Sequence, residues 1–282
     1  MLTIGNDELE VTLLDPEVDL ARLGSRYCSG GYVYQVTDRK LGPLCAGPQY
    51  PAAMPIPFHG QGLPEVFEIA LGQHRARVGD EVLVLGVGRV LRESPARPFH
   101  VRDNPTVTER ARYDVEREQS ALTMLTAQTF ERTALELDRR VSLDGRSFES
   151  RTRVKNHGDV ALPLRWFAHP FFPFSDDAWI ALSLEADFAE NPGFGWSDDG
   201  RIVPKPAHAW LSGQYVPIRT ALGYELTARQ AHPSLGALDI ECRFPLGFLA
   251  LWGNDRTLSL EPFFHTVLEA GNSAVWSIVY RF

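Results

Sequence analysis

Alternation of residue types with a period of two runs through much of this 282-residue chain and constrains its fold more than any other feature. In segments 148–155 and 238–244, charged residues alternate with apolar or small ones, and in segment 274–282 four large apolar residues occupy every second position. Successive side chains of a β-strand point to opposite faces of the sheet. Each segment therefore predicts a strand with one covered face.

Turn signals separate these segments from other strand-like runs, for example Asp144-Gly145 and the polar stretches 156–159 and 198–200. No run of ordinary helix length carries both start and stop signals, and only a short turn is expected near 16–23. Short strands joined by connections rich in Gly and Pro predict an all-β protein, a sandwich or barrel. The further strands are expected at 9–14, 32–36, 66–71, 82–91, 107–116, 122–130, 135–143, 180–184, 223–228 and 247–252.

The length and the even composition predict one domain over residues 1–282, since no repeat and no change in composition marks a boundary. Residues 41–64 carry no formal charge but hold six of the 20 prolines. This density excludes a membrane-spanning helix and predicts a long structured loop.

Charge and cysteine content restrict the partners and the compartment. The net charge is −8 and the charges are scattered, which argues against nucleic acid and against an anionic membrane as the main partner. Residues 1–20 are acidic and lack a continuous apolar core, so we expect no signal peptide and a cytoplasmic protein. The three cysteines have no CxxC spacing and predict neither a disulfide framework nor a zinc site.

Two strand ends carry the titratable side chains of most interest. The segment 148–174 predicts a hairpin whose second strand ends at His169, with Leu164 and Trp166 on one face and His169 on the other. Segment 257–264 ends in the same way, with Glu261 on the face opposite Leu260. Both groups are expected to point away from the core, onto a concave surface of one sheet, although each residue type at a strand end is also compatible with a purely structural role.

His59 is a third candidate, because it ends the proline-rich loop and is followed by Gly60, which lets the backbone approach a ligand closely. The pairs Phe171-Phe172 and Phe263-Phe264 are expected to be core residues rather than sugar platforms. Phosphate-loop, zinc-protease and nucleophile-elbow motifs are absent, the eight histidines are dispersed, and no metal site is expected.

Taken in order, six motifs resemble those of the galactose mutarotase-like superfamily, the aldose 1-epimerases and their relatives. They are the glycine-containing strand 30–33, the His-Gly motif 58–60, the segment 154–163, the segment His169-Pro170-Phe171-Phe172, the strand Leu260-Glu261-Pro262 and the turn 268–273. The resemblance implies a large antiparallel β-sandwich, the galactose mutarotase-like supersandwich, that binds a monosaccharide on a concave face.

The resemblance also implies roles. His169 acts as the general acid that protonates the ring oxygen, Glu261 as the general base at the anomeric hydroxyl, and His59 as a substrate hydrogen-bonding residue. A hemiacetal needs one proton delivered and one removed, so groups on opposite sides of the ring are expected, with an ionised glutamate beside a protonated histidine. No cofactor is required.

The residues after His169 and after Gly60 depart from the galactose-type pattern and from the hexose-6-phosphate pattern, so the sugar stays open. A homodimer is compatible with the sequence. Two rival functions remain: a non-catalytic carbohydrate-binding protein on the same scaffold, and another sugar-active enzyme, a lyase or a hydrolase.

Overall fold

Antiparallel β-sheets make up the protein, as the sequence predicts. The computed structural model describes residues 1–282, with every side chain except that of Ser212. It contains 25 strands in four sheets, and within the described chain the helical segments are two short 3-10 turns, η1 (Leu20–Arg22) and η2 (Trp210–Ser212). No helix of the described residues is long and apolar enough to cross a membrane.

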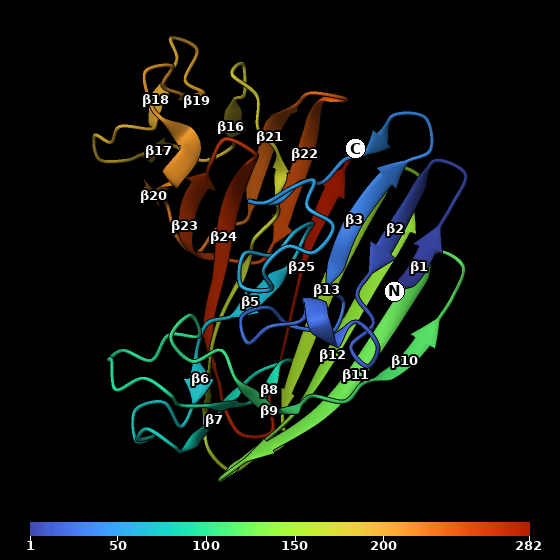
Figure 1. Cartoon of the computed structure of the whole chain (residues 1–282), viewed down its shortest axis with the longest axis vertical. Helices are drawn as coiled ribbons and strands as arrows, with labels where there is room; N and C mark the ends of the chain where they lie inside the picture. The colour runs from blue at the N-terminus through green and yellow to red at the C-terminus, as the bar shows by residue number, and fades with distance from the viewer.

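The larger sheet has ten strands, and its long members β11, β12 and β13 run side by side in Figure 1. All its pairings are antiparallel. In spatial order the strands are β10 (Asp114–Arg117), β11 (Ala121–Phe130), β12 (Thr133–Asp144), β13 (Ser147–Asn156), β25 (Ser273–Arg281), β22 (Gly236–Arg243), β21 (Leu226–His232), β16 (Ile180–Leu182), β19 (Ile202–Pro204) and β18 (Phe194–Trp196).

The second sheet has seven strands and carries both predicted catalytic segments. Its centre is the antiparallel pair β14 and β24, which aligns Trp166 with Phe264 and Phe167 with Phe263. In spatial order the strands are β17 (Ala186–Asp187), β20 (Gln214–Thr220), β23 (Leu246–Gly253), β24 (Thr257–Leu268), β14 (Leu162–Ala168) and β5 (Glu65–Phe67), and β15 (Phe172–Pro173) pairs with β24.

Two four-stranded sheets complete the fold. The sheet β1–β4 contacts β11 and β12 and adds residues such as Ile4 and Val11 to the main core. The sheet β6–β9 surrounds a smaller apolar cluster around Val82 and Val90. Their strands are β1 (Leu2–Gly5), β2 (Leu9–Leu13), β3 (Val33–Asp38), β4 (Gly42–Pro43), β6 (Ala70–Leu71), β7 (Glu81–Val84), β8 (Gly88–Leu91) and β9 (Val107–Arg110).

The main core lies between the two large sheets and confirms the predicted β-sandwich. Trp276 of β25 meets Trp166 of β14 with ring centroids 5.7 Å apart and Phe264 of β24 at 4.8 Å. The period-two alternation produces this layer, since the apolar set of each segment faces inward while Arg151 and Arg243 stay exposed. Truncating one such aromatic side chain to alanine costs about 3–5 kcal/mol in typical cores.

The hairpin expected over 148–174 is wrong. β13 and β14 belong to different sheets, where β13 pairs with β25 and β14 pairs with β24. Both strands bury an apolar face in the same core, with Val154 and Leu162 among its members, so the chain arches from one layer to the other instead of pairing edge to edge. The Asn156 side chain holds this arch, because its amide donates to the carbonyls of Val160 and Leu268 at 2.8 and 2.9 Å.

Three expected strands are in fact pairs of shorter ones. Segment 66–71 divides into β5 and β6, segment 82–91 into β7 and β8, and segment 107–116 into β9 and β10. In the second case Gly86 turns the chain with a φ of 70°, and a Cβ there would lie 2.3 Å from the Cys28 sulfur. Only glycine accommodates both the left-handed backbone and this contact.

A buried ion pair links the two large sheets. Glu65 of β5 and Arg139 of β12 are 4% and 1% exposed, and a guanidinium nitrogen of Arg139 lies 2.5 Å from a carboxylate oxygen of Glu65. Ser150 and the indole N–H of Trp166 also donate to this carboxylate, at 2.5 and 2.9 Å. The charges are therefore compensated, which is the condition for burying them.

Candidate active site

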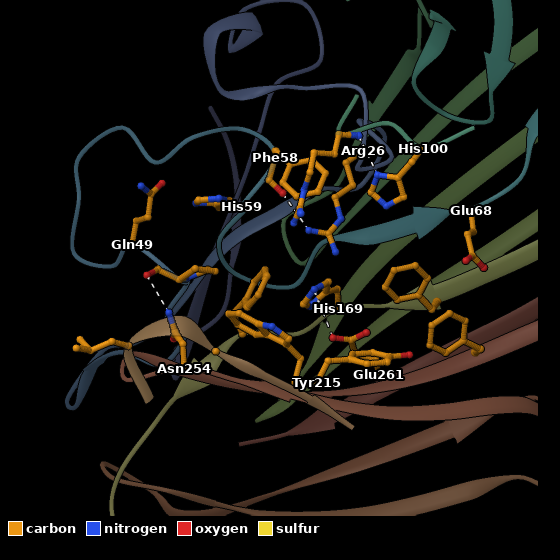
Figure 2. A pocket seen from close by; sticks show the side chains of 18 residues that line it. Arg26, Gln49, Phe58, His59, Glu68, His100, His169, Tyr215, Asn254 and Glu261 are labelled. Carbon is orange, nitrogen blue, oxygen red and sulfur yellow. Dashed lines mark hydrogen bonds and ion pairs between the residues drawn. The ribbon is translucent and has the colours of Figure 1, made fainter. Parts of the chain in front are cut away.

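A pocket of about 650 Å³ opens on the face of the seven-stranded sheet that points away from the main core. Figure 2 shows the side chains that line it. Its floor comes from β14, β23 and β24, and its walls come from loops around Arg26, from the proline-rich segment and from residues 100–102. The pocket contains all three residues that were predicted from the sequence: His169, Glu261 and His59.

His169 follows the last residue of β14 and is fixed by both its backbone and its ring. Its N–H donates to the Pro64 carbonyl at 2.9 Å, so the end of the proline-rich loop continues the sheet beside it. Nδ1 shares a hydrogen bond of 2.8 Å with Oγ of Ser259, which is fully buried. The other ring nitrogen is thereby directed toward Glu261.

Glu261 lies on β24, two residues after Ser259 and on the same face of the strand. Its Oε1 lies 3.4 Å from Nε2 of His169, and both residues are 4% exposed. The predicted alternation is confirmed, because Leu260 and Trp166 point into the core while Glu261 and His169 point into the pocket. The two groups are adjacent on the floor, however, so the expectation that they face each other across a sugar ring is wrong.

Burial determines the protonation of this pair. It raises the pKa of Glu261 to about 8, and the charge of Arg26 opposes the rise. It lowers the pKa of His169 well below its usual value, and the charge of Arg26 adds to the fall. At neutral pH the site therefore holds a protonated Glu261 beside a neutral His169. The expected ionised glutamate beside a protonated histidine is wrong for this state, because desolvation penalises both charges.

Aromatic rings surround His169 and explain its desolvation. The centroid of its ring lies 4.4 Å from that of Phe171, 5.9 Å from Phe167 and 6.1 Å from Trp252. Phe263 stacks on Phe167 at 4.4 Å and lines the same pocket. These rings offer apolar surface to the carbon-bound hydrogens of a ligand.

The expectation that both phenylalanine pairs are core residues is confirmed, because all four side chains are buried in apolar clusters. Phe172 and Phe264 lie in the main core, whereas Phe171 and Phe263 lie in a second cluster and also line the pocket. Neighbouring residues of an extended segment face opposite sides, so a consecutive aromatic pair serves both surfaces at once.

His59 lies in the wall of the pocket, and its Nδ1 is buried without a hydrogen-bond partner among the described protein groups. Gly60 has a φ of 74°, and a Cβ there would lie 2.6 Å from the Tyr27 ring. The expected close backbone approach is therefore real, but it serves packing against Tyr27. Burial first, and then the charge of Arg26, lowers the pKa of His59.

Seven polar residues of the pocket were not predicted from the sequence: Arg26, Gln49, Glu68, His100, Arg102, Tyr215 and Asn254. Arg26 and Asn254 lie in loops, where the period of the sequence gives no information. Tyr215 lies on β20, whose exposed and buried residues alternate, and this signal could have identified it. Burial, and then the charges of Glu261 and Glu68, raise the pKa of Tyr215 to about 12, so its hydroxyl is protonated at neutral pH.

A metal site has no support in the geometry of the described side chains, since no group of three or more His, Cys, Asp or Glu residues is placed to hold an ion. The pocket offers one acid–base pair on an aromatic floor, with arginine and histidine side chains in the opposite wall.

Comparison with known proteins gives structural relatives but no sequence relatives. No protein-family model matches the chain. No curated protein matches it either.

Solved structures with the same fold include a galactose mutarotase related enzyme from Lactobacillus acidophilus, with a TM-score of 0.63, 12% identity, and coverage of 99% of this chain and 96% of that one. A galactose mutarotase-like protein from Lactobacillus casei has a TM-score of 0.60 and 14% identity over 100% and 99% of the two chains. A protein from Escherichia coli K12, proposed to be an aldose 1-epimerase, has a TM-score of 0.61 and 14% identity over 99% and 97%. The resemblance to the galactose mutarotase-like superfamily is therefore confirmed at the level of the fold.

Proposed function

We propose that this protein is an aldose 1-epimerase-like enzyme, an isomerase that interconverts the anomers of a monosaccharide by acid–base catalysis through His169 and Glu261. One observation carries the proposal: Nε2 of His169 and Oε1 of Glu261 lie 3.4 Å apart on the floor of a pocket lined by aromatic rings. The fold shared with galactose mutarotase-like proteins supports the same conclusion.

The spacing of the pair suits the reaction. Ring opening breaks the bond between the anomeric carbon and the ring oxygen, delivers a proton to that oxygen, and removes a proton from the anomeric hydroxyl as the aldehyde forms. Both oxygens are bonded to the same carbon, so two neighbouring groups on one floor can serve both. Rotation about the bond to the aldehyde carbon and closure with the proton transfers reversed then give the other anomer.

The pair requires one mobile proton, and the buried site supplies it. A protonated Glu261 beside a neutral His169 has the same number of protons as an ionised Glu261 beside a protonated His169. Either arrangement provides one donor and one acceptor, and the reverse reaction uses the opposite assignment. Ser259 keeps the His169 ring in position during both steps through its hydrogen bond to Nδ1.

Polarimetry tests the proposal directly. A panel of free aldoses, each dissolved as a single anomer, is followed with and without the protein. We expect the protein to accelerate mutarotation of at least one sugar, and His169→Gln and Glu261→Gln to abolish the acceleration. If sugars bind but no rate exceeds the spontaneous one, the protein is a carbohydrate-binding module and the proposal fails.

The hydrolase alternative can be examined in the same experiment. Hydrolysis of a glycoside normally uses two carboxyl groups, and Glu68 lines the pocket together with Glu261. Glu68 already pairs with Arg165 at 3.4 Å, which makes it a poor partner for a glycosidic oxygen. We expect no release of the aglycone from aryl glycosides; release that depends on Glu68 would favour the hydrolase.

A further inference from the structure

Two arginine side chains share one aromatic ring in the wall of the pocket. The guanidinium carbons of Arg26 and Arg102 lie 4.7 and 4.9 Å from the centroid of the Phe58 ring. Arg26 also lies over Tyr27 at 4.9 Å and donates to the Phe58 carbonyl at 3.0 Å. A guanidinium that stacks through its face keeps N–H groups at its edge available for a ligand.

Neither arginine has a carboxylate partner. Among the side chains that the structure describes, no Asp or Glu oxygen lies within 4.0 Å of the guanidinium nitrogens of either Arg26 or Arg102. The pocket carboxylate Glu68 pairs instead with Arg165 at 3.4 Å. The walls of this pocket therefore hold two positive charges that the protein itself does not neutralise.

These two charges act on the same neighbours. Burial is the largest cause of the lowered pKa of His59, and the charges of Arg26 and Arg102 lower it further. Burial and the same two charges also lower the pKa of His100, where the charge of Asp103 opposes the shift. Two like charges beside one aromatic ring repel one another, and a bound anion offsets this repulsion. Arg26 is half-buried, which makes its missing partner more costly than that of a fully exposed arginine.

His100 adds a donor to this wall. Its Nδ1 accepts the backbone N–H of Arg102 at 3.1 Å, so its proton in the neutral form resides on Nε2. Figure 2 shows Arg26, Phe58 and His100 on one side of the pocket and Glu261 and Tyr215 on the other.

We propose that the substrate is an aldose carrying an anionic group, a phosphate ester or a carboxylate, remote from its anomeric carbon, and that Arg26 and Arg102 bind this group. The inference rests on the proposed function for its orientation, since the anomeric carbon must lie at His169 and Glu261. The far end of the sugar ring then points to the opposite wall. Guanidinium groups bind both phosphate and carboxylate through paired N–H donors.

The positive wall contrasts with the negative charge of the protein as a whole. The net charge of −8 repels anions on average, so a local positive site is needed to attract them. On the floor, Glu261 is mostly protonated below pH 8 and adds little negative charge. Arg26 and Arg102 therefore supply positive charge to the wall that a ligand meets.

The test compares a neutral hexose, the corresponding hexose 6-phosphate, and the corresponding hexuronate, with inorganic phosphate as a competitor. Binding is measured by calorimetry and anomer exchange by NMR. We expect one of the anionic sugars to bind at least about 10-fold more tightly than the neutral one. Salt at about 0.5 M should lower the affinity for this anionic sugar. The preferred anion identifies the group, and inorganic phosphate should compete if it is the phosphate ester.

Arg102→Gln is the primary variant, because Arg102 is exposed and its charge does not contribute to the pKa shifts of His169 or Glu261. We expect this variant to lower the affinity for the anionic sugar about 10- to 100-fold and the affinity for the neutral hexose less than about 3-fold. Arg26→Gln should act in the same direction. Arg132→Gln is the matched control: it removes the same charge from an exposed pair with Asp159, outside the pocket, and should leave both affinities unchanged.

The outcomes separate this inference from the proposed function. Equal affinity for neutral and anionic sugars, or an anion preference that Arg102→Gln and Arg26→Gln leave intact, overturns the inference even if the protein accelerates anomer exchange. Tight, arginine-dependent binding of an anionic sugar without exchange supports the anion site and overturns the enzyme.

Discussion

Replacing Glu261 by glutamine is expected to stabilise the protein, and to stabilise it more as the pH rises. The carboxyl is 4% exposed, and burial raises its pKa to about 8 from its ordinary value of 4.5. The unfolded chain ionises this group freely, whereas the folded chain keeps it protonated up to about pH 8. The unfolded state therefore binds fewer protons than the folded state between these values, and the stability falls as the pH rises.

The size of the effect follows from the two pKa values. At pH 5 the group costs the folded state about 1 kcal/mol, at pH 7 about 3 kcal/mol, and above pH 8 the cost approaches a plateau of about 5 kcal/mol. Glutamine has nearly the same shape and no charge, so it removes this cost. The contact that it alters is the 3.4 Å approach to His169.

Urea denaturation of the wild type and of Glu261→Gln at several pH values between 5 and 9 measures the effect. The difference between the two free energies of unfolding should grow by about 3 kcal/mol from pH 5 to pH 8, because other titrating groups are common to both proteins. Glu269→Gln, at an exposed position before β25, serves as the control and should show a constant difference. Parallel stability curves for the wild type and Glu261→Gln would contradict this prediction, since they would mean that Glu261 ionises normally in the folded protein.

Three further predictions concern the pair and its support. The pH profile of kcat/KM should have an alkaline limb near pH 8, where Glu261 loses its proton, and an acidic limb below 6.5, where His169 gains one; constant activity up to pH 9.5 would contradict this. Ser259→Ala should lower kcat about 10-fold with little change in KM and shift the acidic limb of the pH profile. Ser259→Thr keeps the hydroxyl and should recover most of the rate. Unchanged kinetics of Ser259→Ala would exclude a positioning role for this side chain. Glu65→Gln leaves Arg139 buried without a counter-charge and should cost about 3–5 kcal/mol in urea denaturation, while a loss below about 1 kcal/mol would show that the pair is not needed.

The alternation of the sequence predicted the faces of the strands correctly. It placed His169 and Glu261 opposite Trp166 and Leu260, and the structure confirms both assignments. Period two is a local property of one strand, so it can be recognised without knowing the partner strand. In β12 the same alternation puts Arg139 on the buried face with Leu137 and Val141. An arginine at such a position indicates a buried ion pair, a signal in the sequence that was not used for prediction.

The pairing of strands could not be predicted in the same way. β13 and β14 are neighbours in sequence, yet they find their partners in β25 and β24, more than 90 residues later. A connection of five residues fits an arch between two layers as well as a hairpin, and the choice depends on the other strands of each sheet. Local turn signals therefore indicated where strands end but not which strands pair.

The walls of the pocket were the least predictable part. Arg26, Phe58 and Arg102 come from three loops and meet only because the strands between them are folded. The burial of His169 and Glu261 was not predicted either. Both side chains point away from the core as expected, but the loops cover them almost completely. This cover changes the protonation of the pair, which no strand pattern could indicate.

Anomer exchange of the preferred sugar, measured by NMR magnetisation transfer, is the decisive test of catalysis by His169 and Glu261. The rate is compared for the wild type, His169→Gln, Glu261→Gln and the double variant. Groups that transfer protons as one unit are not additive. We expect each single variant to lose nearly all of the enzymatic rate and the double variant to lose little more. A wild-type rate equal to the spontaneous rate, or single variants that keep most of the activity, would contradict this expectation.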